Sequence, residues 1–483
     1  MSPVPLVYPK PTSEILGPPN LPRYAYPGIP VDLSSVYPPP EALQKPSLPA
    51  GQRKPIWGDD NRIPYTLTTH IVPAAYLRED EDIVLPDTPT ADETMTKEER
   101  KVCIQKAESK LREIRRKYEN EGRHPQHKAL WLCLNRYART STHTAKGGFT
   151  LFFAHANGFH KETWEPTILS LLSSQQSQSC VQEIWVWEAC NHGDSALLNI
   201  GKLNSLIHTR SAARDLLNFL IYYLPSTPAL FPLPTHLPRV AQSEAQRRIQ
   251  NGFTSHDSPR NPICAVGHSF GGAISTLATI SHPSLFTSLF LVDPVITYPN
   301  PEFYYTPNSL ALGALGRRGS WNSREDARKG FLESAFFRAW DPRVLDLYVE
   351  SALYQDQVRI RLKTPPIQEA IVFTDAGTGA PEAWVRLWKK ELDPRIKLRW
   401  AMPGPGKPDL DSRHNATQER VWLCPENCSN LYLVKKLLIT WRKCCRRRPE
   451  LGCSVIPLHQ LTFILLFPGF PEQKVRATAR LIF

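Results

Sequence analysis

The sequence predicts an α/β protein built on a mostly parallel β-sheet. From about residue 128, short apolar segments alternate with amphipathic helical stretches, which is typical of βαβ units. One apolar segment leads directly into a glycine-flanked serine and then into a run of small residues, a strand–turn–helix arrangement. With 483 residues, of which 41% are apolar, the chain is long enough to bury a large core.

The N-terminal part of the chain has a different composition. The first 50 residues hold 14 of the 46 prolines, and proline fixes the backbone angle φ and removes a hydrogen-bond donor. We therefore expect residues 1–95 to form a Pro-rich, largely disordered leader. Residues 96–127 are dense in Lys, Arg and Glu, which predicts a charged helix with a solvated face.

Seven short apolar segments are the strand candidates. The alternation stops after residue 293, and over about 70 residues aromatic side chains recur within helix-like sequence, as in a helical insert placed on a sheet. The alternation then resumes. The strand candidates are residues 129–134, 149–154, 183–187, 263–266, 289–292, 396–400 and 429–433.

These patterns give a domain organisation with one core and three additions. The first half of the core precedes the helical insert, the second half follows it, and a basic tail of unusual composition ends the chain. The expected segments are the leader 1–95, the charged helix 96–127, the first half of the core 128–298, the helical insert 299–365, the second half of the core 366–434 and the tail 435–483.

The net charge of +12 could suggest a nucleic-acid-binding protein, but its distribution does not support that class. The tail 435–483 holds 10 basic and 2 acidic residues, so most of the excess lies outside the predicted core. The sequence contains no run of 18 apolar residues, so we expect no transmembrane helix. The N-terminus lacks the pattern of a signal peptide. We expect no nucleic-acid partner, and a cytoplasmic or peroxisomal location.

Cofactors and metals are not indicated. The sequence has neither the phosphate-binding G-x-x-x-x-G-K-[ST] motif nor the glycine fingerprint of dinucleotide-binding folds. The ten cysteines lack paired C-x₂-C spacing, so free thiols in a reducing compartment are favoured over a zinc site.

The motif that indicates chemistry is Gly267-His268-Ser269-Phe270-Gly271, a G-x-S-x-G nucleophile elbow between a strand and a helix. Ser269 must occupy a strained turn, and a Cβ at position 267 or 271 would collide with the neighbouring strand or helix. This arrangement places the Ser269 hydroxyl at the N-terminus of a helix, where the helix dipole favours a developing anion.

A nucleophilic serine also needs hydrogen-bond donors for the developing oxyanion. One candidate is the backbone N–H of Phe270, directly after the serine. The other is the backbone N–H of Asn157, in the segment His155-Ala-Asn-Gly-Phe that follows the strand candidate 149–154.

Four segments carry a resemblance to a known family: FFAHANGFHKETWEP (152–166), WEACNHGDSALLN (187–199), GHSFGGA (267–273) and LVDPVI (291–296). They resemble the α/β-hydrolase superfamily, in particular fungal hydrolases of the peroxisomal-lipase and toxin-biosynthesis type. The resemblance implies an eight-stranded, mostly parallel sheet with helices on both faces, a helical lid, and lipase- or esterase-like hydrolysis by a Ser/acid/His triad. It also implies a small apolar or lipid-like ester as the substrate.

The triad acid and base are less evident than the serine. Asp293 closes the strand candidate 289–292 and is the favoured acid, with Asp409 and Asp411 as alternatives in a later loop. The histidine expected soon after the last strand is missing, and the next one is His459 in the tail.

The missing histidine leaves two functional hypotheses. The first is an active serine hydrolase, and the second is an impaired, hydrolase-like scaffold or non-functional product. His459 is the candidate base if the tail folds back, and otherwise it is a remote tail histidine. Three other histidines are not assigned as the base: His268 flanks the serine, and His155 and His192 are interpreted as packing residues of strand-end loops.

Overall fold

The computed structural model describes most of the chain between residues 11 and 434. Outside the description lie residues 1–10, 13, 16, 18–32, 34, 42, 79–82, 90–94, 122–125, 141–147, 229–231, 255–257, 259, 301–304, 376–378, 404–415 and 435–483. Three expected site residues, Asp409, Asp411 and His459, and the predicted tail therefore lie outside the described residues.

The core is an eight-stranded sheet with the strand order β1-β2-β4-β3-β5-β6-β10-β11. Within it β2 runs antiparallel to its neighbours β1 and β4, whereas β3 to β6, β10 and β11 pair in parallel. The predicted fold class is thus confirmed. The strands are β1 Tyr65–Pro73, β2 Trp131–Arg139, β3 Phe149–Ala154, β4 Val181–Trp187, β5 Ile263–His268, β6 Phe286–Val292, β10 Lys397–Pro403 and β11 Cys428–Val434.

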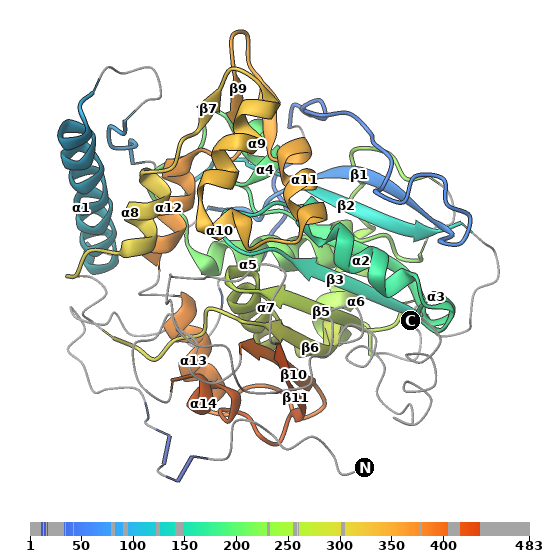
Figure 1. Cartoon of the computed structure of the whole chain (residues 1–483). Coiled ribbons are helices and arrows are strands. Elements are labelled where there is room, and N and C mark those ends of the chain that lie inside the picture. The colour runs from blue at the N-terminus through green and yellow to red at the C-terminus, as the bar shows by residue number, and fades with distance from the viewer. Residues whose placement is uncertain are drawn as a thin grey trace, which may run out of the picture.

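Helices cover both faces of this sheet (Figure 1). Alternate side chains of each central strand face opposite sides, as a period of two requires. On one side Phe152 and Trp185 pack in a cluster with α5, α7, α12 and α13, and on the other side Leu151 and Ile184 pack with α2. The helices of the core are α2 Glu165–Leu172, α3 Gln175–Cys180, α4 Gly193–Leu198, α5 Thr209–Asn218, α6 Gln242–Asn251, α7 Phe270–Ser281, α12 Pro366–Thr374, α13 Gly379–Trp388 and α14 Ala416–Val421.

The insert between β6 and α12 lies above the end of the sheet at which β3 and β5 finish (Figure 1). The sequence predicted a helical insert, and this prediction was incomplete. Besides helices, the insert contains a small antiparallel sheet with the strand order β7-β9-β8. Its elements are α8 Ser309–Leu315, β7 Ser320–Trp321, α9 Arg324–Glu333, α10 Ala335–Arg338, α11 Pro342–Ser351, β8 Leu353–Gln355 and β9 Ile360–Leu362.

One expectation for the N-terminal part was wrong. Residues 65–73, assigned to the disordered leader, form β1, which pairs with β2 over its whole length. Local composition hid this strand, because its partner comes from a segment distant in the sequence. Helix α1, Lys97–Glu121, lies within the segment predicted as a charged helix and has an exposed side that carries Lys106 and Lys110. Its other side buries Leu111 and Tyr118 and lies beside α8 and α12 (Figure 1).

Among the described residues, no helix is long and apolar enough to cross a bilayer.

Candidate active site

Ser269 occupies the turn between β5 and α7. Its φ of +53° lies in a region that non-glycine residues rarely adopt. The turn is held from both sides, because the Ser269 N–H donates to the Val292 carbonyl at 3.0 Å and the Val295 N–H donates to the Ser269 carbonyl at 3.0 Å. Among the described residues, no side chain hydrogen bonds to the half-buried Ser269 hydroxyl.

The flanking glycines meet a steric requirement. A Cβ on Gly267 would lie 2.4 Å from the carbonyl oxygen of Gly271, and a Cβ on Gly271 would lie 2.4 Å from the carbonyl oxygen of Ala154 in β3. Both obstacles are backbone atoms, which cannot rotate away. The expected collision with strand and helix is therefore confirmed, and it brings the start of α7 against the end of β3.

The loop after β3 faces this turn. The Gly271 N–H donates to the His155 carbonyl at 3.1 Å, and Phe159 N–H to Ala156 carbonyl at 3.1 Å closes a tight turn over residues 156–159. Gly158 has φ +77° at the third position of that turn, as a type II turn requires. The backbone N–H of Asn157 makes no hydrogen bond to another described residue.

Asp293 lies beside the serine turn at the end of the adjacent strand. In the β5–β6 register His268 pairs with Val292, so Ser269 and Asp293 each follow a paired residue at the same edge of the sheet. Asp293 is half-buried, has φ +40°, and donates its N–H to the Ala401 carbonyl of β10 at 2.8 Å. The structure thus brings Ser269, Phe270, Asn157 and Asp293 together at one edge of the sheet.

The three histidines near the serine are buried, and burial lowers their pKa values. The pKa of His268 falls to about 4, and its ring packs 6.1 Å from Phe159 and 6.2 Å from Trp164. The pKa of His155 falls to about 3, and its Nε2 accepts the Ala189 N–H at 3.0 Å. His192 also has a pKa well below its ordinary value.

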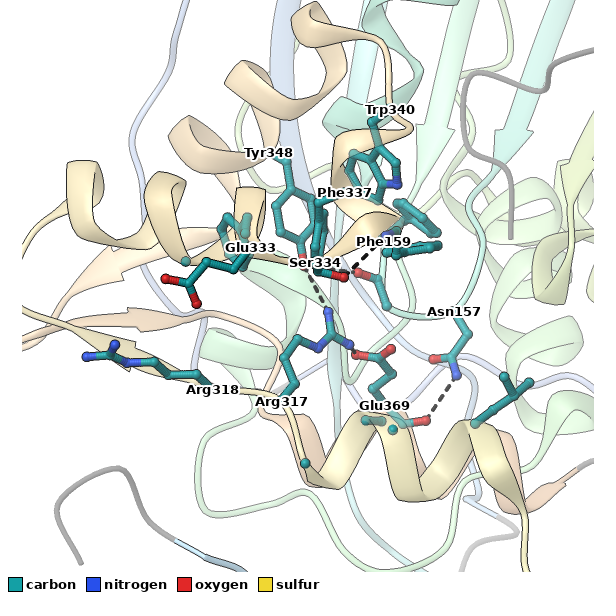
Figure 2. Close-up of a pocket in the computed structure, with 18 of the residues that line it drawn as sticks. Asn157, Phe159, Arg317, Arg318, Glu333, Ser334, Phe337, Trp340, Tyr348 and Glu369 are labelled. Carbon is teal, nitrogen blue, oxygen red and sulfur yellow. Dashed lines mark hydrogen bonds and ion pairs between the residues drawn. The ribbon is translucent and has the colours of Figure 1, made fainter. Parts of the chain in front are cut away.

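A cavity of about 490 Å³ opens between this loop and the insert. Figure 2 shows Asn157 and Phe159 of this loop together with the insert residues Phe337, Trp340 and Tyr348, all of which line the cavity. Ser269 is not among the residues that line the cavity. The aromatic walls of the cavity are formed by Phe159, Trp321, Phe331, Phe336, Phe337, Trp340, Tyr348 and Phe373.

Polar contacts cross the cavity at its base. Arg317 forms an ion pair with Glu369 of α12 and donates to the Tyr348 hydroxyl at 3.4 Å, and Asn157 Nδ2 donates to the Glu369 carbonyl at 3.0 Å (Figure 2). The Tyr348 hydroxyl in turn donates to the Gly158 carbonyl at 3.4 Å. The loop after β3 is therefore attached to both α12 and the insert.

A buried charge cluster beneath the insert was missed by the sequence analysis. Lys161 is fully buried, and its Nζ lies 3.0 Å from Glu162, 3.4 Å from Glu188 and 2.6 Å from Asp194. Lys363, just after β9, lies 2.6 Å from Asp194. The available signal was the presence of charged residues inside the apolar segments FHKETWEP and WEACNHGD.

The order of the eight strands, with β2 alone antiparallel and a serine at a strained strand–helix turn, defines an α/β-hydrolase fold. The model of the alpha/beta hydrolase family matches residues 151–417, more than half of the chain, and the chain belongs to this family. The resemblance inferred from the sequence is thereby confirmed.

Curated relatives of the chain include proteins of Alternaria alternata and Penicillium brevicompactum. The chain is 33% identical over 108 residues to Abhydrolase domain-containing protein ACTT2-1 of Alternaria alternata, covering 22% of this chain and 40% of the relative. It is 28% identical over 200 residues to the type I acyl-CoA thioesterase mpaH of Penicillium brevicompactum, covering 41% of this chain and 38% of that protein. The matches thus span about 40% of the length of these relatives.

Among solved structures, the peroxisomal α/β-hydrolase Lpx1 of Saccharomyces cerevisiae is similar with a TM-score of 0.50. The two chains are 16% identical, and the match covers 76% of this chain and 81% of Lpx1. This likeness supports the fold.

Proposed function

We propose that this protein is a serine hydrolase that cleaves an acyl ester with Ser269 as the nucleophile. The observation that carries the proposal is the strained backbone of Ser269, held between two glycines at which a Cβ would strike backbone atoms. Strained non-glycine residues cluster at active sites, where the surrounding structure maintains them. Membership of the hydrolase family supports the same reaction class.

In the proposed reaction, the Ser269 oxygen attacks the acyl carbonyl carbon while a base takes the hydroxyl proton. The bond to the leaving group then breaks, and that group departs with the proton. Water next attacks the acyl-serine by the same route and releases the acid. The proposed base is His459 and the proposed acid Asp293, with Asp409 and Asp411 as alternatives.

The proposed oxyanion donors are the backbone N–H groups of Asn157 and Phe270. Phe270 is the first residue of α7, and the first N–H groups of a helix have no acceptor within the helix. The Asn157 N–H makes no hydrogen bond to a described residue. Neither N–H group has an acceptor among the residues that the structure describes, so this pair from adjacent backbone turns is suited to stabilise a negatively charged oxygen.

The proposed acyl group is apolar. The aromatic walls of the cavity between Asn157 and the insert support this, because desolvation of apolar surface there favours binding. A thioester is the second candidate substrate, since one relative is named a type I acyl-CoA thioesterase. Oxygen esters and thioesters share the same acyl-serine intermediate, so one serine serves both.

Labelling with a fluorophosphonate probe tests the nucleophile. We expect the wild type to be labelled and Ser269→Ala to lose both labelling and hydrolysis, because no oxygen remains to attack. The matched control is Ser275→Ala on the same helix: Ser275 is buried and its hydroxyl has no partner among the described residues, so labelling should be unchanged. Labelling of folded Ser269→Ala at the wild-type rate would contradict the proposal.

A panel of p-nitrophenyl esters and acyl thioesters of rising chain length then identifies the preferred acyl group. The alternative of an impaired, hydrolase-like scaffold is not favoured by the comparisons, which include a named thioesterase among the relatives. It predicts a folded protein that hydrolyses none of these substrates.

A further inference from the structure

His192 contacts both of the backbone turns that carry the proposed oxyanion donors. It precedes α4 in the loop after β4, and its side chain is fully buried. Its Nε2 lies 3.0 Å from the Gly158 nitrogen in the loop after β3, and its ring stacks at 6.3 Å on that of Phe270. One side chain thus contacts the residue after Asn157 as well as the residue after Ser269.

The contacts around His192 favour a proton on Nδ1. Asn191 Nδ2 donates to the Gln368 carbonyl at 3.2 Å, so Asn191 Oδ1 is an acceptor, and it lies 2.8 Å from His192 Nδ1. His192 Nε2 lies 3.0 Å from the Gly158 nitrogen and also 3.0 Å from Asn157 Oδ1. A neutral ring with its proton on Nδ1 donates to Asn191 and accepts the Gly158 N–H, whereas a proton on Nε2 would serve Asn157 alone and leave the Gly158 N–H without its acceptor.

This arrangement determines the orientation of the turn at residues 156–159. Because the Gly158 N–H is bound to His192, it does not compete with the Asn157 N–H for the oxyanion. The Gly158 Cα is also held close to Glu369, since a Cβ on Gly158 would come within 2.7 Å of the Glu369 carboxyl group. The Asn157 side chain is fixed as well, because its Nδ2 donates to the Glu369 carbonyl. The Asn157 N–H makes no hydrogen bond within the described part of the structure.

We infer that His192 is a positioning residue: as a neutral imidazole it accepts the Gly158 N–H and so holds the Asn157 N–H in place for the oxyanion. This inference rests on the proposed function and assigns His192 no proton transfer. Burial, then the neighbouring His155, His160 and Arg317, keep the pKa of His192 well below its ordinary value, in agreement with a neutral ring.

Two substitutions separate the acceptor from the ring. His192→Phe keeps a flat ring against Phe270 but removes the acceptor, and kcat should fall about a hundredfold with KM changed less than about threefold, since loss of oxyanion stabilisation affects the transition state. His192→Gln restores an acceptor through Oε1, and kcat should return to within about tenfold of the wild type.

A buried histidine remote from the site provides the folding control. His70 is fully buried in β1, where it bonds to the Pro234 carbonyl at 2.9 Å and packs 5.5 Å from Trp185. His70→Phe should lower the melting temperature and leave kcat unchanged. An unchanged kcat in well-folded His192→Phe would overturn the inference while leaving the proposed function intact.

The protonation state is measurable without activity. Two-bond ¹H–¹⁵N spectra of the full chain labelled with ¹⁵N-histidine report the tautomer of each ring. The His192 signal is assigned by its loss in His192→Gln. It should show the neutral Nδ1–H tautomer from pH 5.5 to 8. An Nε2–H tautomer, or titration near pH 6.5, would overturn the inference even if His192→Phe does not fold. A wild type that hydrolyses nothing and is not labelled would overturn the proposed function and, with it, this role.

Discussion

At the scale of single residues, the strain at Ser269 is concentrated in one backbone conformation. A non-glycine residue in such a region costs on the order of 1–3 kcal/mol, and it persists only where its surroundings over-determine it. Here the surroundings are the two backbone hydrogen bonds to β6 and its following loop, and the glycine contacts with the end of β3. The serine turn is therefore positioned by three neighbouring segments of the sheet.

The glycine contact can be tested by adding a single methyl group. Gly271→Ala places a Cβ 2.4 Å from the Ala154 carbonyl oxygen, and we expect a loss of about 1–3 kcal/mol of unfolding free energy together with reduced hydrolysis. Gly313→Ala on α8 is the stability control, because no atom lies within 4 Å of its Cβ and alanine favours a helix. Thermal unfolding measures both. Equal melting temperatures for Gly271→Ala and the wild type would contradict the close contact.

The local part of the candidate site could be predicted from the sequence, and the remainder could not. A G-x-S-x-G turn is set by neighbours within five residues, so Ser269 and both glycines were identified from their spacing alone. The contacts of His192 and Lys161 join loops from different strands, and nothing in the local sequence of either residue encodes such convergence. The acid and the base present the same difficulty, and they stay predictions.

At the scale of elements, the charge cluster connects the core to the insert. The four charged residues come from separate segments: Lys161 lies in the loop region after β3, Glu188 follows β4, Asp194 lies in the first turn of α4, and Lys363 follows β9. Beside the ion pairs, the Gly193 N–H donates to the Thr364 hydroxyl at 2.9 Å. Breaking a buried pair leaves an uncompensated charge, which typically costs several kcal/mol, so this cluster resists separation of the insert from the loop that carries Asn157.

The cluster contains two lysines and three carboxylates, so one carboxylate is in excess. Burial, with Glu162 and Asp194 nearby, raises the pKa of Glu188 to about 7, so Glu188 is protonated in the folded state below about pH 7. Lys161 and other neighbouring positive groups lower the pKa of Glu162 and of Asp194 although burial opposes this. When Glu188 is neutral, the negative charges of Glu162 and Asp194 therefore balance the positive charges of the two lysines.

This balance predicts a pH dependence of stability. Between the ordinary glutamate pKa of 4.5 and about 7, the folded state binds a proton at Glu188 that the unfolded state has lost, so the unfolding free energy should fall as the pH rises through this window. Glu188→Gln removes the titration, and it should be more stable than the wild type by about 1–3 kcal/mol at pH 8 and similar to it near pH 4.5. Urea unfolding at each pH measures the difference. Parallel curves for the two proteins would contradict the assignment.

The elements of the core were easier to predict than those at its margins. Strands β3 to β6 are buried on both sides and read as continuous apolar runs, which the sequence displays directly. Strand β1 begins with Tyr-Thr-Leu-Thr-Thr and follows a Pro-rich region, so composition averaged over the leader concealed it. The small sheet of the insert consists of strands of two or three residues, too short for a period-two pattern.

At the scale of the whole molecule, the N-terminal segments are part of the globular body. Val36 is buried in the main core cluster, and Arg214 of α5 donates to the Ser35 carbonyl at 3.0 Å. Arg53 reaches Glu165 of α2 with a nitrogen–oxygen distance of 2.5 Å. The described part of the leader thus packs on the hydrolase core along much of its length, and the domain is larger than residues 128–434.

Truncation tests the extent of the domain. A chain that begins at residue 75 keeps α1 and β2 but lacks β1, and so loses the buried side chains of Tyr65, Leu67, Ile71 and Val72 and exposes the edge of β2. At about 1.5–3 kcal/mol for each buried apolar side chain, the loss is comparable with the whole stability of a typical domain. We expect this chain to aggregate.

The matched control begins at residue 33, which retains Val36, Arg53 and all of β1, and it should be soluble and unfold cooperatively close to the wild-type temperature. Soluble yield and differential scanning calorimetry distinguish the two chains. If the chain that begins at residue 75 were soluble and unfolded at the same temperature as the control, β1 would be an accessory strand, and the hydrolase core would extend no further than its sequence pattern indicated.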